Sequence, residues 1–287
     1  MANVAKIAGD GSSPRRAKIP RASELPDAPR PLEYVEPSGV VLSKLGKHIM
    51  AMGVDIETAD WIPGKHALHK GQFGFHTMCA DIDFDQRIVQ VGWSIREVSR
   101  DSLIEEEGEV IVRPDGFEIA KKAADLHGIT TQRAMAEGLP LATVMDQFMT
   151  VMHRTHKRGG CVVIHNLEFD AGIVDKELVT AGLEHWRPVW HVIAKEGFCT
   201  MDPDIGKWIQ MCRGRVRDAS QDSNAVMSLT NIINDMATML PMNEVQEFRK
   251  NKIHTAGEDA HMHCLIYTAL RKLSASAEVP ASDLHGV

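Results

Sequence analysis

The stretch Ile49–Ile56, with the sequence IMAMGVDI, decides the fold. Its compact run of apolar residues predicts a buried strand in the interior of a sheet. Two further strand patterns follow, Arg87–Ile95 (RIVQVGWSI) and Gly108–Val112 (GEVIV), and each is bounded by polar residues or proline. Three strand signals in succession predict an antiparallel meander that begins with Ile49–Ile56.

Helix and strand patterns alternate after the meander. We predict helices at 117–126, 141–153, 166–181, 229–240 and 256–273, and strands at 161–164 and 198–201. Asn166 is the predicted N-cap of its helix, and Gly182 is the predicted C-cap. The expected fold class is α/β, with one domain built on a mixed sheet that is flanked by helices.

The composition is that of an ordinary globular chain, since 44% of the 287 residues are hydrophobic and 25% are charged. No run approaches the ~18 uninterrupted apolar residues of a membrane span, which excludes an integral membrane protein. The odd count of five cysteines argues for a reducing compartment, so we expect an intracellular protein of the cytoplasm or nucleus, with an organelle as the alternative. A net charge of −7 argues against a protein that coats nucleic acid, but it is compatible with an enzyme that handles nucleic acid in one cleft.

Two polar, proline-bearing segments enclose the predicted domain. Residues 1–45 show no helical or strand period, which predicts a flexible leader, and they lack the apolar core of a secretory signal. Residues 46–273 form the expected domain, and residues 274–287 form an expected disordered tail.

Two carboxylates, Asp55 and Glu57, close the first strand. Residues two apart in a strand project from the same face, so both side chains leave the sheet on one side. Acids at the end of an apolar strand are costly to bury unless a cation neutralises them, and carboxylate oxygens suit magnesium or manganese. For this pair alone, a solvated strand end is the alternative.

A third acid, Asp170, lies one turn into the helix that follows a strand. Ile173, Val174 and Leu178 come after it at helical spacings, which puts Asp170 on the stripe that faces the core. A core-facing aspartate needs a partner, and a metal shared with the first two acids would supply one. A surface aspartate on an imperfect stripe is the alternative.

The fourth acid, Asp259, lies in the first turn of the last predicted helix and shares a face with Met262. Thr255 and Glu258 fit a capping box, in which each side chain satisfies a free backbone amide at the start of the helix. His254 lies on the loop just outside. A histidine beside a fixed carboxylate suits proton transfer because its unperturbed pKa lies near neutrality, while an ordinary surface role is equally compatible with the sequence.

Together the four acids fall at strand ends or first helical turns, and all are expected to point inward. Four inward carboxylates can hold two divalent cations ~3.5–4 Å apart, the arrangement that clamps the attacking and leaving oxygens in phosphodiester cleavage. A histidine can then activate the water.

The order of these motifs resembles the histidine branch (DEDDh) of the DEDD 3′→5′ exonucleases. This family includes the proofreading subunit of bacterial replicative polymerase, ribonuclease T and the oligoribonucleases. The matching motifs are D-I-E-T at 55–58, H-N-x-x-F-D at 165–170 and H-x4-D at 254–259. In addition, R-I-V-Q-V-G-W at 87–93 is similar to the family's second strand, and H-G-I-T at 127–130 is similar to its helix-ending signature.

The resemblance implies a ribonuclease-H-like fold whose mixed five-stranded sheet carries two Mg²⁺ ions, for which Mn²⁺ would substitute. It implies that Asp55, Glu57 and Asp259 bind metal directly. Asp170 would support the second ion directly or through water, and His254 would be the general base. The enzyme would release 5′-mononucleotides from the 3′ ends of single-stranded RNA or DNA.

The resemblance also suggests residues around the substrate. Thr58 would lie beside the terminal sugar, while His165, Asn166 and Phe169 would shape the pocket. Asn166 is equally explained as a plain N-cap, and Phe169 as plain core.

The chain departs from the family between its first two strands, where residues 59–86 make a much longer connection. This connection contains four residues whose spacing could hold structural zinc, namely His66, His69, His76 and Cys79. A loop that touches phosphate or a partner is the favoured alternative. A second loop carries Arg213, Arg215 and Arg217, which would contact the phosphates of the scissile strand or form a solvated charge run.

Three functions remain open at this point. The first is an exonuclease of single-stranded 3′ ends. The second is a narrower enzyme, either an oligoribonuclease-like scavenger of short RNAs or a DNA proofreader. The third is a non-catalytic module that holds 3′ ends, and the unpaired inward acids argue against it. The resemblance also allows a homodimer, and we expect no membrane partner.

Overall fold

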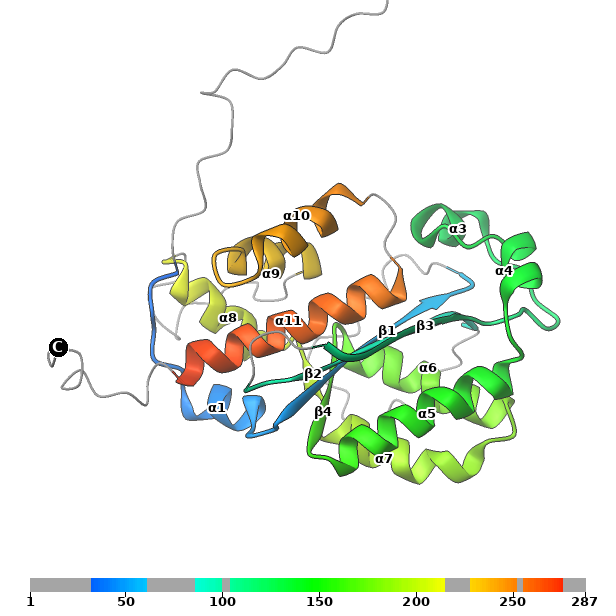
Figure 1. The fold of residues 1–287 in the computed structure, drawn as a ribbon, viewed down its shortest axis with the longest axis horizontal. Coiled ribbons are helices and arrows are strands. Elements are labelled where there is room, and N and C mark those ends of the chain that lie inside the picture. The colour runs from blue at the N-terminus through cyan, green and yellow to red at the C-terminus, as the bar shows by residue number, and fades with distance from the viewer. Residues whose placement is uncertain (1–31, 61–85, 100–103, 215–227, 252–254, 276–287) are drawn as a thin grey trace, which may run out of the picture.

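The computed structural model describes residues 32–60, 86–99, 104–214, 228–251 and 255–275. Its core is a five-stranded sheet with the order β3-β2-β1-β4-β5 (Figure 1). The strands are β1 (Met50–Thr58), β2 (Ile88–Glu97), β3 (Ile104–Ile111), β4 (Gly160–Ile164) and β5 (Phe198–Cys199). The pairs β1–β2 and β2–β3 are antiparallel, and the pairs β1–β4 and β4–β5 are parallel. The predicted fold class, a ribonuclease-H-like mixed sheet with an antiparallel meander, is confirmed.

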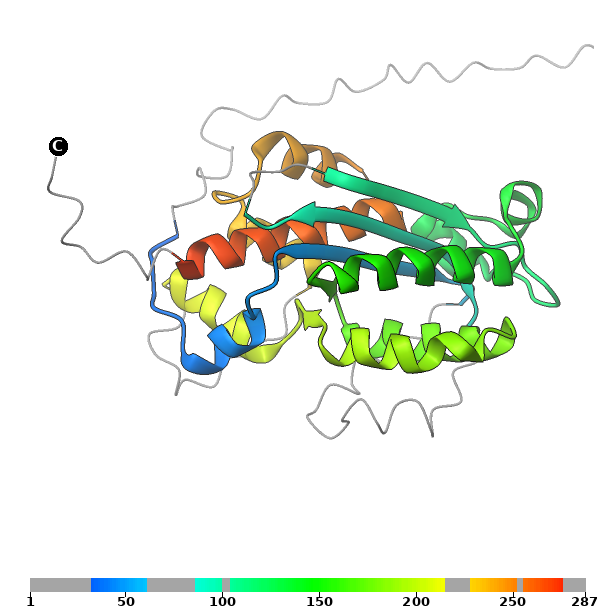
Figure 2. The ribbon, with the colours of Figure 1, turned by 60° about the horizontal axis from the view of Figure 1, so that its bottom comes forward.

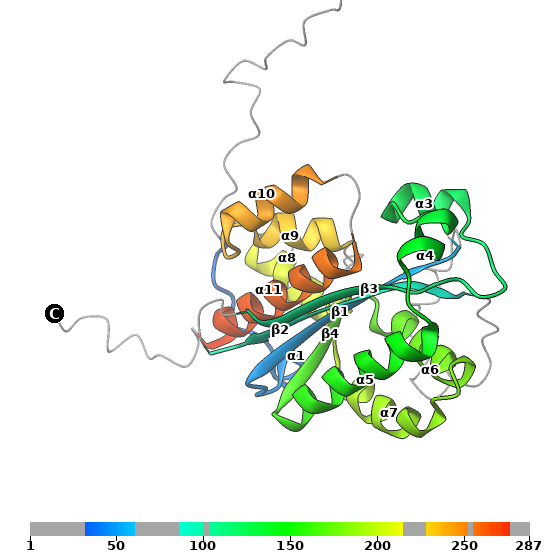
Figure 3. The same cartoon turned by 45° about the vertical axis from the view of Figure 1, so that its right-hand side comes forward.

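Helices cover both faces of the sheet (Figures 2 and 3). One face carries α5 (Leu141–Lys157), α6 (Leu167–Thr180) and α7 (Arg187–Lys195). The other face carries α8 (Pro203–Cys212), α9 (Leu229–Met236), α10 (Met242–Lys250) and α11 (Ala256–Ala275). The smaller elements are α1 (Gly39–Leu45), α3 (Lys121–His127), α4 (Thr131–Glu137) and the 3-10 turn η3 (Glu184–Trp186).

Strand alternation decides which side chains of β1 meet which layer. Met52 and Val54 belong to the apolar cluster of α5, α6 and α7, whereas Ala51 belongs to the cluster of α11. Side chains two apart share a face, so Asp55 and Glu57 project on the side of α11.

Two glycines let α11 lie directly on the sheet. A Cβ atom at Gly53 of β1 would lie 1.8 Å from the carbonyl oxygen of Ala260, and a Cβ atom at Gly92 of β2 would lie 2.1 Å from the carbonyl carbon of Ala256. Gly92 is also the antiparallel register partner of Asp55. The missing side chains therefore place the first turn of α11 beside Asp55.

Part of the predicted flexible leader is folded, which corrects that expectation. Helix α1 lies within residues 1–45, and its Val41 and Leu45 are buried in the cluster around α11. The indole Nε1 of Trp208 donates a hydrogen bond to the carbonyl oxygen of Val35 at 2.8 Å. A helix of seven residues owes its stability to packing rather than to propensity, so the local pattern gave no signal.

The cap prediction for α6 is half right. Asn166 has φ 69° and makes no side-chain cap hydrogen bond, so it is not the side-chain N-cap that we predicted. Gly182, which follows the helix, has φ 70°, as expected for a glycine at a helix C-terminus.

The other differences concern helix boundaries. The helix predicted at 229–240 ends at Met236, and the chain then turns into α10. Helices α4, α7, α8 and α10 lie where no helix was predicted.

The predicted insertion at 59–86 and the tail at 274–287 fall largely outside the described residues and stay predictions. No helix in the described ranges is both long and apolar enough to cross a membrane.

Candidate active site

The strand β1 and the helix α6 deliver three of the predicted acids. Asp55 and Glu57 are partly buried and leave β1 on the side of α11. Asp170 lies in the first turn of α6 and is only 5% exposed. The predicted inward position of Asp170 is therefore confirmed, because a surface aspartate would not be buried to this extent.

The helix α11 delivers Asp259 in its first turn. The hydroxyl oxygen of Thr255 accepts a hydrogen bond from the backbone N–H of Glu258 at 3.3 Å, which is one half of the predicted capping box. The other half differs, because the Glu258 carboxylate accepts a hydrogen bond from the Asn251 amide at 2.7 Å. Glu258 thus links the end of α10 to the start of α11 rather than capping α11.

The four-acid cluster of Asp55, Glu57, Asp170 and Asp259 is coupled electrostatically. Burial raises the pKa of Asp55 well above its usual range, and the charges of the other three acids raise it further. Burial together with the charges of Asp259 and Glu109 raises the pKa of Glu57 to about 8. The structure therefore brings together acids that are far apart in the sequence, and each of them resists ionisation beside the others.

The pKa values of the remaining two acids, Asp170 and Asp259, are also raised. Burial and the charge of Glu57 raise the pKa of Asp170 well above its usual range. Burial and the charge of Glu258 raise the pKa of Asp259 to about 7. Because several acids interact, the protons of the cluster are expected to leave in steps that belong to the group rather than to single residues.

The side chains of the cluster are not arranged in the geometry of a metal site. Within the part of the chain that the structure describes, no group of three or more His, Cys, Asp or Glu side chains is arranged so as to hold a metal ion. The donor chemistry of four carboxylates nevertheless suits hard, oxygen-preferring cations. Direct metal ligation by these residues stays a prediction.

A pair of stacked histidines, His263 and His165, lies next to the cluster, and His263 had no predicted role. His263 is fully buried, and its Nδ1 lies 2.9 Å from the carbonyl oxygen of Val54, which can only accept a hydrogen bond. Burial lowers the pKa of His263 to about 4, so the ring is neutral with its proton on Nδ1. Its ring stacks on that of His165, with the centroids 6.2 Å apart. His263 lies four residues after Asp259, and this helical spacing was the available signal.

The other histidine of the pair, His165, is a predicted pocket residue. Its Nδ1 lies 2.8 Å from the hydroxyl oxygen of Thr200, just past β5. The pair therefore joins α11 to the ends of β1, β4 and β5, and it holds the residue that precedes Asp55.

The helix-ending signature at 127–130 has a clear structural role. The Nδ1 of His127 accepts a hydrogen bond from the backbone N–H of Ile129 at 3.2 Å, which leaves Nε2 to donate to the carbonyl oxygen of Thr58 at 3.3 Å. Gly128 has φ 73°, a conformation that favours glycine. His127 thus anchors the end of β1 directly after Glu57.

The other predicted pocket residues are placed as follows. The hydroxyl of Thr58 donates to the carbonyl oxygen of Asp60 at 3.0 Å. Phe169 is partly buried and packs against the cluster of α5 and α6. Arg213 has a side chain that is only 9% exposed, and it interacts with Asp235 and with the carbonyl oxygen of Asn234. This position within the fold does not favour the phosphate contact predicted for Arg213.

Several predicted residues lie outside the described ranges, and their roles stay predictions. They are the proposed base His254, the arginines Arg215 and Arg217, and the zinc candidates His66, His69, His76 and Cys79.

No protein-family model and no curated protein matches the sequence. Solved structures of exonuclease I are similar to it in fold. The E. coli exonuclease I complex with a dT13 oligonucleotide aligns at 15% identity and TM-score 0.47, over 79% of this chain and 41% of that chain. The zinc-bound E. coli ExoI–ssDNA complex aligns at 15% identity and TM-score 0.46, over 79% and 40%. A further exonuclease I structure aligns at 16% identity and TM-score 0.48, over 79% and 41%.

This chain spans less than half the length of these exonuclease I chains. A likeness at such identities and TM-scores does not assign an activity.

Proposed function

We propose that this protein is a divalent-metal-dependent 3′→5′ exonuclease that hydrolyses phosphodiester bonds in single-stranded nucleic acid. The observation that carries the proposal is the convergence of β1, α6 and α11 on one four-acid cluster in which every pKa is raised. Such a cluster destabilises the fold when its members ionise, and a cationic ligand offsets this cost. Clustered carboxylates that hold two cations are a known arrangement for phosphodiester cleavage.

The donor set fits oxygen-preferring cations. Asp55, Glu57 and Asp259 would hold them directly and Asp170 would support the second, with Mg²⁺ as the expected ion and Mn²⁺ as a substitute. When bound, the cations neutralise charge that develops on the phosphate oxygens.

His254 is the proposed general base. Its imidazole would take a proton from the attacking water as the water oxygen forms a new bond to phosphorus. The bond from phosphorus to the 3′ oxygen of the preceding nucleotide breaks, and that oxygen takes up a proton from solvent. The products are a 5′-mononucleotide and a strand that is one nucleotide shorter.

The direct test is hydrolysis of 5′-end-labelled single strands. We expect a ladder of products that shorten from the 3′ end when the protein is incubated with a 20-nucleotide DNA or RNA in Mg²⁺, and no products in EDTA. A series of RNAs from two to twenty nucleotides separates a general exonuclease from an oligoribonuclease-like scavenger, and a mismatched primer–template separates it from a proofreader. Binding of 3′ ends without any product from either polymer would contradict the proposal and favour the binding module.

Replacing the proposed base should affect chemistry more than binding. We expect His254→Ala to lower kcat by about 10²–10⁴-fold, because a positioned base contributes on that order, and to leave the Kd for a labelled single strand within about twofold. His185→Ala, which removes an exposed histidine on η3, is the matched control and should leave both values unchanged. Equal losses of kcat and of affinity in His254→Ala would contradict its role as base.

The raised pKa values predict how metal-free stability depends on pH. A carboxyl whose pKa is raised in the folded state stabilises the fold at low pH, and this contribution is lost as the pH rises through the folded-state pKa. The pKa of Glu57 is about 8, so the melting temperature in EDTA should fall between pH 6.5 and pH 8.5, by roughly 5 °C. Added Mg²⁺ or Mn²⁺ should reduce the fall, because cations favour the ionised carboxylates.

The matched control for this titration is Glu57→Gln. His261, whose pKa is raised above its usual value, also titrates in the direction of lower stability at higher pH, but it is retained in this variant. The difference between the two proteins therefore reports Glu57 together with its effect on the other acids of the cluster. Equal pH profiles for the wild type and Glu57→Gln in EDTA would show that the cluster does not control stability.

A further inference from the structure

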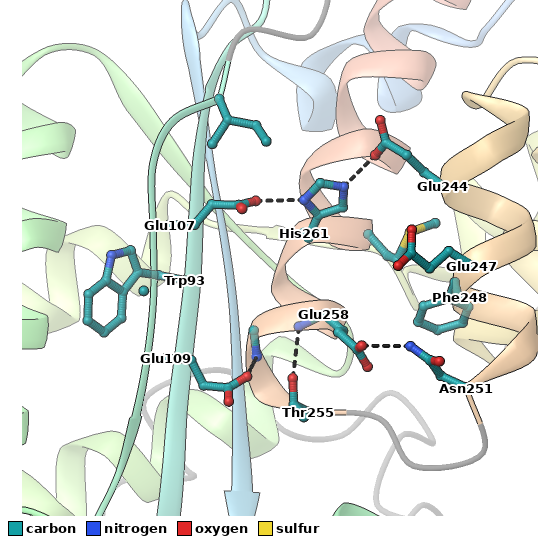
Figure 4. Close-up of a pocket in the computed structure, with 14 residues that line it drawn as sticks. Trp93, Glu107, Glu109, Glu244, Glu247, Phe248, Asn251, Thr255, Glu258 and His261 are labelled. Atoms are coloured by element: carbon teal, nitrogen blue, oxygen red, sulfur yellow. Dashed lines mark hydrogen bonds and ion pairs between the residues drawn. The ribbon is translucent and has the colours of Figure 1, made fainter.

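A cavity lies beside the first turn of α11. It is a cavity of about 610 Å³ bounded by β3, α10 and the start of α11 (Figure 4). None of the four acids proposed to hold metal lines it. The proposed nuclease chemistry therefore leaves this cavity unexplained.

The cavity wall carries an excess of negative charge. Five glutamates line it, namely Glu107, Glu109, Glu244, Glu247 and Glu258, and His261 is the single basic side chain in the lining. The buried guanidinium of Arg96, which does not line the cavity, lies 3.6 Å from the Glu244 carboxylate, so five carboxylates still face two basic groups. His261 lies between Glu107, at 2.6 Å, and Glu244, so its positive charge is paired with glutamates of the wall (Figure 4). The Glu247 carboxylate is exposed and has no hydrogen-bond or ion-pair partner among the described residues. Such a wall repels phosphates and favours a cationic ligand.

The same wall contains an edge strand. The sheet order places β3 at the edge, where β2 is its partner on one side. Near the end of β3, the outer edge makes two backbone hydrogen bonds with Leu139. The N–H of Arg113 donates to the carbonyl oxygen of Leu139 at 2.8 Å, and the N–H of Leu139 donates to the carbonyl oxygen of Ile111 at 2.9 Å. Before Ile111, no second strand pairs with β3 among the described residues. An edge of this kind offers backbone N–H and C=O groups to an added strand.

A buried donor, the indole N–H of Trp93, lies across β3 from the glutamates (Figure 4). Trp93 is 3% exposed and lines the cavity, and its indole Nε1–H has no acceptor among the described residues. Trp93 packs with Phe148 in the cluster of α5, whereas His261 belongs to α11, so the lining includes residues from both faces of the sheet, with β3 between them. An added Cβ atom at Gly108 of β3 would lie 2.1 Å from Cζ2 of Trp93, so the indole packs directly on β3.

We propose that this cavity and the free edge of β3 bind an extended, lysine- or arginine-rich peptide segment of a partner protein. Its backbone would pair with β3, its basic side chains would meet the glutamates, and its apolar side chains would contact Phe248 and Met262 of the lining. The site goes beyond the proposed nuclease activity and does not depend on it.

Other occupants fit these features less well. A second copy of β3 would oppose glutamates with glutamates, because the strand reads IEEEGEVI, and like charges directly opposite each other are destabilising. A polyamine would satisfy the glutamates, but it has no backbone amide and carbonyl groups that could pair with β3.

The test measures fluorescence anisotropy of a labelled nine-residue peptide of alternating arginine and valine, added to the full chain in 150 mM salt. We expect binding to weaken by at least about fivefold in Glu247→Lys, because the change reverses one charge of the wall. Glu184→Lys, on the exposed turn η3, changes the net charge equally and should bind within about twofold of the wild type. A peptide with N-methyl groups at every interior residue should bind at least about tenfold more weakly, since neither of its edges can then donate backbone hydrogen bonds to a strand.

Each alternative gives a distinct result that overturns the proposal. Equal weakening in Glu247→Lys and Glu184→Lys would mean general attraction to an acidic protein. Equal binding of the N-methylated peptide would exclude strand addition. If spermine displaces the peptide at a concentration equal to the peptide's Kd, the acidic wall is a polyamine site. If a glutamate–valine peptide binds as tightly as the arginine–valine peptide, charge does not select the ligand.

Discussion

Single substitution of Asp55 or Asp259 by asparagine is expected to abolish exonuclease activity, by at least about 10³-fold in kcat/KM, while the protein stays folded. Asparagine keeps the size of the side chain but removes the charge that the cluster would offer to a cation. The effect should be large because charge stabilisation of the phosphate depends on the intact set of acids. Asp115→Asn, at an exposed position away from the cluster, is the matched control and should retain full activity.

The variant Asp55→Asn is expected to lose activity but to gain stability in the absence of metal. Burial and neighbouring charges raise the pKa of Asp55 well above its usual range, so the wild-type cluster resists ionisation without metal. We therefore expect Asp55→Asn to melt at a higher temperature than the wild type in EDTA at pH 8.5, and to lose the increase that Mg²⁺ causes in the wild type. Full activity in both Asp55→Asn and Asp259→Asn would refute the metal assignment. A lower melting temperature in EDTA would refute the electrostatic explanation.

Replacement of Gly92 by alanine is expected to lower activity about 10²-fold with only a moderate loss of stability. The added Cβ atom would lie 2.1 Å from the carbonyl carbon of Ala256, so the first turn of α11 must move outward. That turn carries Asp259, and a displacement of about 1 Å at a catalytic group can cost 10²-fold in rate. Overpacking at a buried contact usually costs about 1–3 kcal/mol, so the free energy of unfolding should fall by a similar amount.

The control for Gly92→Ala is Gly39→Ala in α1, where an added Cβ atom has no neighbour within 4 Å. This variant should keep both activity and stability. The measurements are kcat/KM at a temperature well below both melting temperatures and the Mg²⁺ concentration for half-maximal rate, which should rise in Gly92→Ala alone. Unchanged activity and metal requirement in Gly92→Ala would show that the close packing of α11 on β2 does not position Asp259.

The fold could be predicted from the sequence wherever local pattern and long-range packing agree. The runs around Ile49–Ile56 and Arg87–Ile95 are mostly apolar because these strands are buried on both faces, and both are central strands. Helix α1 could not be predicted, because its burial depends on residues far away in α11 and α8.

The candidate site also has features that the sequence predicts and features that depend on the fold. The inward position of Asp170 followed from the helical spacing of its neighbours, and the structure confirms it. The partner of Glu258 could not be predicted, because the competing donor Asn251 belongs to the end of α10 and its approach depends on the fold. The neutral state of His263 likewise depends on its burial where α11 packs against β1, which no local pattern reports.

Asp259, the last acid of the cluster in the sequence, belongs to α11, which packs on Gly53 and Gly92. The ribosome synthesises α11 long after β1. A nascent chain that has left the ribosome only as far as α10 has Asp55, Glu57 and Asp170 but no Asp259. If the cluster performs the proposed reaction, translation itself delays the activity, and RNA near the ribosome is safe from a nuclease that is still being made.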